Sequence, residues 1–243
     1  MMDLLTAWRS NARTDTGKVR SRNEDAFLAL PERGLWAVAD GMGGHQNGAL
    51  ASRLIVEQLA ELHGGSDLDL RVQQLRKALH SVNRSLSREL TLISGQPEPV
   101  MGSTVVALLA EGDRAACVWA GDSRCYLWRS GGLYQISRDH SLLEQLIEEQ
   151  QMSPEQAASH PSAHALTRAV GADETLVLDV IEFNVYPGDT LLLCSDGLYQ
   201  NMSGADLGTA LNLPSPQLAL ERLFELALDG PARDNLSAVV IRR

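Results

Sequence analysis

Five aspartates stand beside apolar stretches that have the length and composition of β-strands. Asp40 ends the stretch LWAVA, and Asp196 ends TLLLCS. The other three border similar stretches and are Asp25, Asp122 and Asp234. Glycine directly follows Asp40 and Asp196, and Asp-Gly is by itself a common turn. The same residue type at five strand ends nevertheless suggests one shared site.

Carboxylates packed at one end of a sheet repel one another, and burial raises their pKa values. Divalent cations remove that cost, and a site of oxygen ligands without a Cys or His cluster favours Mg²⁺ or Mn²⁺. Two such ions about 3.5–4 Å apart lower the pKa of a water between them, and that water can attack phosphorus. If the strand ends converge, the acids predict metal-dependent hydrolysis of a phosphate ester.

Composition narrows the class of protein. The chain has 243 residues and a formal charge of −10, so it lacks the excess of Lys and Arg typical of nucleic-acid-binding proteins. No apolar stretch approaches a membrane span, and the N-terminus lacks the pattern of a signal peptide. We therefore expect a cytoplasmic protein that binds neither nucleic acid nor membrane. Cys117, Cys125 and Cys194 show no metal-binding spacing, and we expect them to be reduced thiols within strands.

The elements that must position the acids come in blocks. Alternating or apolar runs bounded by turn residues predict strands, and apolar residues at helical spacing predict helices. Expected strands lie at 26–30, 34–40, within 102–137, at 176–185, 188–196 and 235–243, and expected helices within 47–65, 69–90, 141–150, 153–160 and 216–228. In the first helix Leu50, Leu54, Ile55 and Leu59 share one face. Such blocks predict an α+β domain with mostly antiparallel sheets.

Eight stretches carry a resemblance to a known family. They are GKVRSRNEDAF (17–27), LWAVADGMGGH (35–45), GSTVV (102–106), AGDSRCYL (120–127), SRDHSL (137–142), LTRAVG (166–171), LLLCSDGL (191–198) and ARDNLSAVVI (232–241). In these stretches the chain resembles the metal-dependent Ser/Thr protein phosphatases of the PPM or type-2C family, in their bacterial form. Each stretch alone is a weak signal, but they follow the family order and span nearly the whole chain.

The resemblance implies a four-layer α-β-β-α sandwich with two central antiparallel sheets and metals at one edge. It implies a single catalytic domain over residues 1–243. Residues 141–173, here called the flap segment, fall where the family has a mobile flap, and in this chain the segment has a helical pattern.

The resemblance also implies the metal ligands. Asp40 bridges two ions, and the carbonyl of Gly41 is a ligand of one of them. Asp196 and Asp234 complete the first ion site. The second ion is held by the Glu24–Asp25 pair, partly through water. Many bacterial members hold a third ion with the residue that matches Asp122, together with Asp196.

Arg20 matches the arginine that clamps the substrate phosphate, and a planar guanidinium suits two phosphate oxygens at once. Many eukaryotic relatives have a histidine, the proposed general acid, where this chain has Met42. Met42 cannot donate a proton, and His45 is the candidate that the sequence offers instead.

The expected function is hydrolysis of phosphoserine and phosphothreonine on proteins with Mn²⁺ or Mg²⁺, in opposition to a bacterial Ser/Thr kinase. The expected partners are phosphorylated proteins, namely a kinase and its substrates, and the expected state is a monomer. The compact chain is similar to the phosphatases that accompany kinases of type VI secretion, although no motif fixes that pathway.

Several alternatives remain open at this point. GDS around Ser123 is found in some serine hydrolases, but this chain lacks their G-x-S-x-G elbow. A non-catalytic binding module is a further class, although such proteins usually lose a ligand aspartate. Individual residues also have ordinary interpretations: Arg20 could be a surface residue, as Arg22 is expected to be, and Glu24 and Asp25 could be an exposed pair before a strand. His140 could hold its loop or contact substrate.

Overall fold

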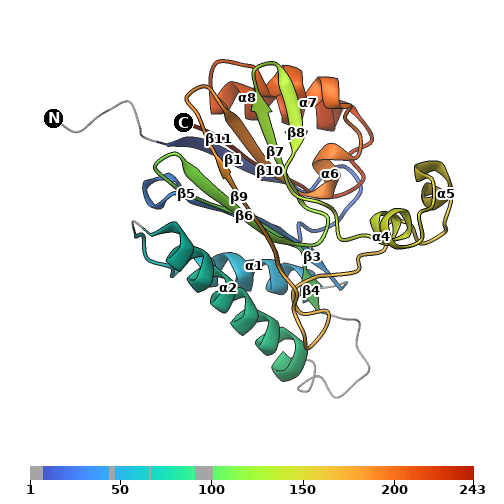
Figure 1. Ribbon diagram of the computed structural model, residues 1–243. Helices are drawn as coiled ribbons and strands as arrows, with labels where there is room; N and C mark the ends of the chain where they lie inside the picture. The colour runs from blue at the N-terminus through green and yellow to red at the C-terminus, as the bar shows by residue number, and fades with distance from the viewer. Residues whose placement is uncertain (1–7, 44–46, 66, 91–100) are drawn as a thin grey trace.

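Two antiparallel β-sheets lie face to face, and helices cover the outer side of each (Figure 1). The computed structural model describes residues 8–43, 47–65, 67–90 and 101–243. Because every strand pairing is antiparallel and the helices form outer layers, the predicted four-layer α-β-β-α sandwich is confirmed.

The first sheet joins the two ends of the described chain. Its order is β1 (Arg9–Asp15), β11 (Leu236–Arg242), β10 (Thr190–Cys194), β7 (Arg124–Arg129) and β8 (Gly132–Gln135). The second sheet runs β2 (Asp25–Leu30), β3 (Leu35–Met42), β5 (Val105–Glu111), β6 (Arg114–Ala120) and β9 (Asp179–Asn184), with β4 (Gly102–Ser103) paired to the end of β3.

The helices divide between the two outer layers and the flap segment (Figure 1). On the second sheet lie α1 (Asn47–Ala60) and α2 (Leu68–Arg84), and α2 continues as a π-helix η2 (Ser85–Leu90). On the first sheet lie α6 (Asp196–Tyr199), α7 (Gly204–Leu211) and α8 (Pro216–Asp229). The flap segment contains α4 (Leu142–Glu149) and α5 (Pro154–Ala158), and η1 (Pro31–Arg33) links β2 to β3.

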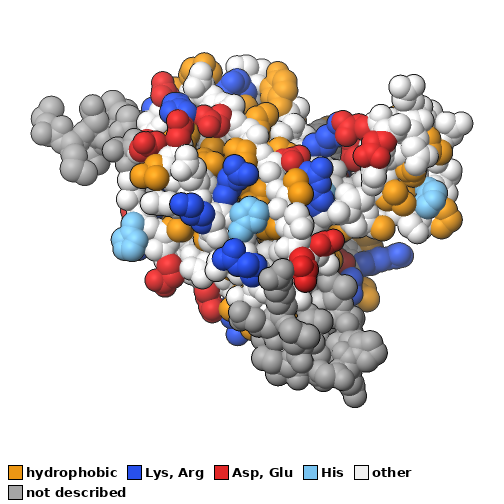
Figure 2. Space-filling view, turned by 60° about the horizontal axis from the view of Figure 1, so that its bottom comes forward, with side chains coloured by type: hydrophobic (Ala, Val, Ile, Leu, Met, Phe, Trp, Pro, Cys, Tyr) orange, Lys and Arg blue, Asp and Glu red, His pale blue; other side chains and the backbone are white. Residues whose placement is uncertain are grey.

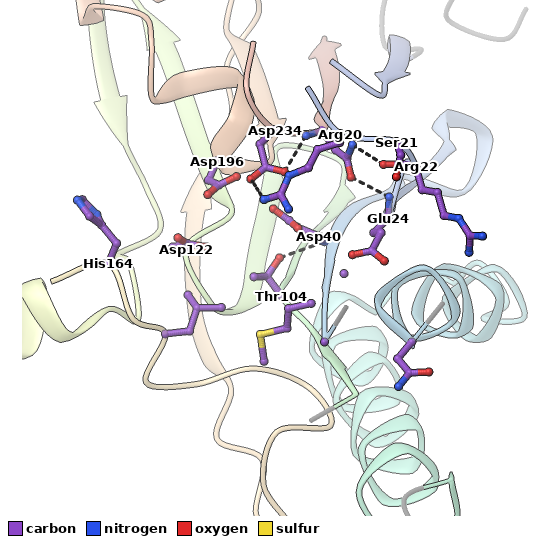
Figure 3. Close-up of a pocket in the computed structure, with 16 residues that line it drawn as sticks. Arg20, Ser21, Arg22, Glu24, Asp40, Thr104, Asp122, His164, Asp196 and Asp234 are labelled. Atoms are coloured by element: carbon purple, nitrogen blue, oxygen red, sulfur yellow. Dashed lines mark hydrogen bonds and ion pairs between the residues drawn. The ribbon is translucent and has the colours of Figure 1, made fainter. Parts of the chain in front are cut away.

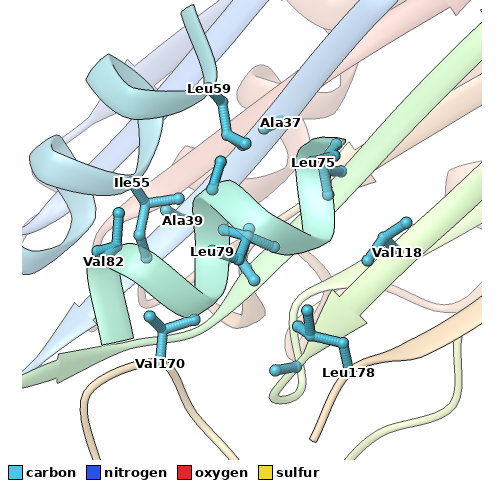
Figure 4. Packing of buried hydrophobic residues seen from close by; sticks show 14 of the residues in the cluster. Ala37, Ala39, Ile55, Leu59, Leu75, Leu79, Val82, Val118, Val170 and Leu178 are labelled. Carbon is cyan, nitrogen blue, oxygen red and sulfur yellow. The ribbon is translucent and has the colours of Figure 1, made fainter. Parts of the chain in front are cut away.

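Strict alternation along the strands builds the three hydrophobic interfaces between these layers. On β3, Leu35 and Ala37 face α1 and α2, whereas Trp36 and Val38 face the other sheet. Figure 4 shows the interface of β3 with the two helices, where Ile55 and other apolar side chains meet. A one-residue slip of register would exchange the two faces, so the alternation fixes where each strand end lies. The three cysteines are buried within strands, as predicted.

Several elements differ from the predictions. Strand β1 was not predicted because its sequence RSNARTD is polar, and it forms by pairing with β11, more than 200 residues away. Helix α7 was also missed, since it is short. Leu50 is exposed, and the small residues Ala51 and Gly48 face inward beside Ile55 instead. Within the described part of the chain, no helix is both long and apolar enough to span a membrane.

Candidate active site

The carboxylates predicted from the sequence meet at one edge of the sandwich, around a cavity of about 1130 Å³ (Figure 3). The predicted site residues that line it are Arg20, Glu24, Asp40, Gly41, Asp122, Asp196 and Asp234. They come from the loop before β2, the end of β3, the β6–β7 turn, the start of α6 and the loop before β11. The convergence on which the sequence argument depended is therefore present.

Asp40 is fixed through its backbone. Its N–H donates to Thr104 Oγ1 at 3.1 Å, and its carbonyl accepts from Ser103 Oγ and from the Thr104 N–H, both at 2.9 Å. The Thr104 hydroxyl also bonds Ser123 Oγ at 2.7 Å. Ser103 and Thr104 therefore have a structural role in holding Asp40, and Thr104 also lines the cavity.

Asp40 lies close enough to the other carboxylates for their charges to act on it. Burial raises its pKa well above the ordinary value, and the charges of Asp25, Asp196, Asp122 and Asp234 raise it further. Burial likewise raises the pKa of Asp122 to about 7. Without a cation, these carboxyl groups hold protons at pH values where an exposed aspartate would be ionised.

Asp25 lies behind the cavity wall and does not line it, unlike Glu24. Its backbone is directly opposite Asp40 in the β2–β3 ladder. One carboxylate oxygen accepts from Ser195 Oγ at 2.8 Å, and the other is buried without a hydrogen-bond partner in the described structure. Burial raises the pKa of Asp25 to about 6.

The donor chemistry fits a hard divalent cation. Besides Asp25 Oδ1, Asp196 Oδ1 is a buried carboxylate oxygen that has no partner among the described residues. Such atoms are costly unless a proton or a cation satisfies them. No three Asp, Glu, His or Cys side chains of the described residues are already grouped to hold an ion. Some of these carboxylates instead accept hydrogen bonds from other side chains: Asp196 Oδ2 accepts one from Gln200 Nε2 at 2.7 Å.

Arg20 and Asp234 form an ion pair on the cavity wall, with 2.6 Å between Nη2 and Oδ2 (Figure 3). The carboxylate raises the pKa of Arg20, so its positive charge is secure. The structure thus places Arg20 at the site rather than on remote surface. Arg22 is exposed, as expected, but it also lines the cavity, which the sequence did not indicate.

Asn235 ties the loop that carries Arg20 and Glu24 to the last strand. Its amide nitrogen donates to the carbonyls of Thr16 and Arg22, both at 2.9 Å, and its Oδ1 accepts from the Glu24 N–H at 2.8 Å. Because the side chain is almost fully buried, these bonds are shielded from water. Asp234 is therefore a carboxylate of the site, and the next residue, Asn235, is a brace that holds the loop of Arg20 and Glu24 in place.

The glycine after Asp40 allows β3 to pass close to the start of α1. A Cβ on Gly41 would lie 2.2 Å from the carbonyl oxygen of Gly48 and 2.6 Å from that of Glu24. The Gly41 N–H donates to the same Glu24 carbonyl at 3.1 Å. This close approach is a structural need for glycine, independent of any metal.

His140 holds its loop rather than lining the cavity. Its Nδ1 accepts from the Gly121 N–H at 3.1 Å, which leaves the proton on Nε2 to donate to Asp179 Oδ2, also at 3.1 Å. Burial lowers the pKa of His140, which favours this neutral form. Asp139 pairs with Arg124 at 2.7 Å. His45 lies outside the described residues.

Ser123 is buried and bonded to Thr104, so it offers no exposed nucleophile for a serine hydrolase. Residues at the cavity that the sequence analysis did not single out include Ser21, Asn47, His164 and Leu166. His164 and Leu166 belong to the flap segment, and Figure 3 places His164 across Asp122 from Arg20. Only the tertiary contact of the flap segment with the site identifies them.

Comparison with known proteins agrees with this geometry. The sequence profile of the Protein phosphatase 2C family matches residues 16–234. The chain is 38% identical over 237 residues to the serine/threonine protein phosphatase PstP of Mycobacterium tuberculosis, covering 96% of this chain and 44% of that protein. It therefore spans less than half the length of this curated relative.

Two solved structures share the fold. PppA, described as a key regulatory component of the type VI secretion system in Pseudomonas aeruginosa, superposes with a TM-score of 0.89 at 42% identity, covering 98% of each chain. The catalytic domain of the serine/threonine phosphatase PstP, in complex with two manganese ions, superposes with a TM-score of 0.83 at 36% identity, covering 97% of each chain.

Proposed function

The chain belongs to the protein phosphatase 2C family, and from that premise we propose that it hydrolyses phosphoserine and phosphothreonine on proteins. The observation that carries the proposal is the carboxylate-lined cavity, in which the charges of four other aspartates act on Asp40. Repulsion and desolvation of these carboxylates lower the stability of the fold, and bound cations offset that loss. A manganese-bound relative of the same fold supports Mn²⁺ or Mg²⁺ as the cofactor.

We assign roles to the residues as follows. Asp40 would be a ligand of two ions, the Gly41 carbonyl would serve one of them, and Asp196 with Asp234 would complete the first site. Glu24, which lines the cavity, would hold the second ion together with Asp25, partly through water. Asp122 with Asp196 would hold a third ion. When bound, the ions supply the Lewis acidity that makes water a nucleophile at neutral pH.

Arg20 binds the phosphate in this proposal. Its ion pair with Asp234 orients the guanidinium at the cavity. A bound phosphate would compete with Asp234 for the N–H donors of that guanidinium, or share them. Met42 lines the cavity with a thioether that holds no proton to donate. His45 therefore remains the proposed proton donor for the leaving oxygen.

We propose that residues 1–243 act as one catalytic domain and as a monomer. The pairing of β1 with β11 supports the single domain, because it joins the two ends of the described chain. The proposed partners are a bacterial Ser/Thr kinase and its phosphorylated substrates. The likeness to PppA favours a role in type VI secretion control.

The function is tested with purified protein, p-nitrophenyl phosphate and a phosphothreonine peptide. We expect turnover of both with Mn²⁺, none after EDTA, and recovery when Mn²⁺ is added back. A serine-directed fluorophosphonate should leave the rate unchanged because Ser123 is buried. Hydrolysis that persisted in EDTA would contradict a metal-dependent phosphatase.

Replacing Arg20 tests the phosphate clamp. We expect Arg20→Ala to raise KM for the phosphopeptide by about tenfold with a smaller change in kcat, because the guanidinium contacts phosphate in ground and transition states alike. The KM of Arg20→Lys should lie between those of the unchanged protein and of Arg20→Ala. Lysine keeps the positive charge but lacks the planar guanidinium that bonds two phosphate oxygens at once. A KM equal to that of the unchanged protein would remove Arg20 from substrate binding.

A further inference from the structure

A second hollow, separate from the carboxylate-lined cavity, lies between α2 and the loop that follows the flap segment. Its volume is about 640 Å³. We call it the α2 cleft, and its wall includes Lys77, His80, Arg84, Glu174, Thr175 and Leu176. None of these residues lines the catalytic cavity.

The wall of the cleft carries two cations, Lys77 and Arg84, and one acid, Glu174, in a chain whose net charge is −10. From Gln73 to Arg84, helix α2 contains Arg76, Lys77 and Arg84 and no Asp or Glu, whereas the whole chain carries −10. Among the described residues, no ion pair engages these three cations, and all three are exposed. In Figure 2, Lys and Arg side chains surround a His on the face turned forward.

The helix dipole explains only part of this pattern. Cations in the last turn of a helix are stabilised by the partial negative charge there, which accounts for Arg84. The effect falls off within one turn, and Lys77 lies seven residues earlier. Glu174 is one carboxylate on the opposite wall, and it does not balance two cations.

The spacing of the cations suits an extended segment better than a single phosphate. Arg84 lies seven positions after Lys77 on the helix, a rise of roughly 10 Å at about 1.5 Å per residue. One phosphate cannot bridge that length. An extended peptide covers it in about three residues, so acidic side chains two to four positions apart would reach both cations.

The loop beside the cleft leads directly from the catalytic cavity. Leu166 lines the cavity and Thr175 lines the cleft, nine residues later. Buried Asn83 of α2 fixes the path between them: its Oδ1 accepts from the Gly171 N–H at 2.7 Å, and its Nδ2 donates to the Asp173 carbonyl at 2.9 Å. A substrate chain that follows this loop from the cavity arrives at the cleft.

We propose that the α2 cleft docks an Asp/Glu-rich segment of the phosphoprotein substrate while its phosphoresidue occupies the catalytic cavity. This inference rests on the proposed function for the identity of the partner. The nine loop residues set the spacer between the phosphoresidue and the acids at up to about nine residues of extended chain.

The first test measures binding without catalysis. A fluorescent, unphosphorylated peptide with four acids within six residues should bind in an anisotropy titration, and its affinity should fall as NaCl is raised. The double variant Lys77→Glu/Arg84→Glu should weaken binding at least tenfold. The control Arg9→Glu/Arg222→Glu changes the net charge equally at exposed residues of β1 and α8, and it should bind as the unchanged protein does.

The second test measures dephosphorylation with Mn²⁺. A phosphothreonine peptide with an acidic stretch about nine residues away should show a KM several-fold lower than the same peptide with a Ser/Gly stretch. The Lys77→Glu/Arg84→Glu variant should lose this difference and keep the rate on p-nitrophenyl phosphate. Equal KM values, or equal effects of both double variants, would overturn the docking proposal.

Two further outcomes separate the possibilities. Binding of a single-stranded oligonucleotide as tight as that of the acidic peptide would overturn an acidic protein segment as the occupant. If the acidic peptide binds at the cleft but p-nitrophenyl phosphate and phosphopeptides are not hydrolysed with Mn²⁺, the proposed function fails and the cleft remains an acidic-peptide site.

Discussion

The variant Asp40→Asn is expected to lose Mn²⁺-dependent turnover by on the order of 10³-fold or more, about 4 kcal/mol of transition-state stabilisation at about 1.4 kcal/mol per tenfold. The change is nearly isosteric, so the backbone bonds to Ser103 and Thr104 can persist. What is removed is the negative charge at the centre of the carboxylate cluster. The measurement is kcat/KM with p-nitrophenyl phosphate at saturating Mn²⁺.

The same variant should be more stable than the unchanged protein when no metal is present. Desolvation of its carboxyl group, and then the charges of the neighbouring aspartates, raise the pKa of Asp40, so its ionised form opposes folding. An asparagine at this position carries no charge, and the melting temperature in EDTA should rise. Asp229→Asn, at an exposed helix end, is the matched control and should change neither activity nor stability measurably. An active Asp40→Asn enzyme, or one destabilised in EDTA, would contradict this assignment.

The raised pKa values also fix the sign of the pH dependence. Asp25 and Asp122 titrate near 6 and 7 in the folded chain, whereas unfolded aspartate titrates at about 4. The folded protein therefore holds more protons than the unfolded chain between about pH 4 and 7, and the stability of the metal-free protein falls as pH rises through that window. Chemical denaturation at several pH values should show this slope, and Mn²⁺ should diminish it.

Gly41→Ala is expected to be strongly destabilising. The new Cβ would meet the backbone carbonyls of Gly48 and Glu24, neither of which can rotate away as a side chain could. We expect a loss of about 3 kcal/mol, at the upper end for overpacking, because β3 and α1 must separate. For a chain of this size that loss lowers the melting temperature by roughly 6–12 °C.

Gly64→Ala is the matched control, because a Cβ at Gly64 would meet nothing within 4 Å. It should change the free energy of unfolding by less than about 0.5 kcal/mol. Activity of Gly41→Ala should also fall, since the shift displaces Asp40 and the loop that carries Glu24. A Gly41→Ala protein as stable as Gly64→Ala would show that the close approach of β3 to α1 is not needed.

The sequence by itself determined the elements whose local signals are strong. The buried strands β3, β5 and β10 were predicted because their apolar runs end at turn residues, and α2 and α8 because their apolar faces repeat at helical spacing. The acids at strand ends were also visible in the sequence, since Asp40 and Asp196 each follow an apolar strand and precede a glycine. The carboxylate oxygens of these acids then indicated a hard divalent cation, because such cations prefer oxygen ligands.

The tertiary structure alone decided which residues meet. The polar strand β1 forms only because β11 offers it a partner, so no local pattern marks it. Arg22 and His164 reach the cavity from loops whose paths depend on contacts such as the brace at Asn235, and local sequence carries no signal for them. The positive α2 cleft likewise exists because the loop after the flap segment packs beside α2. Spacing along the chain predicts which side chains can do chemistry, whereas long-range packing decides which of them share a site, because contacts between distant segments leave no local periodicity.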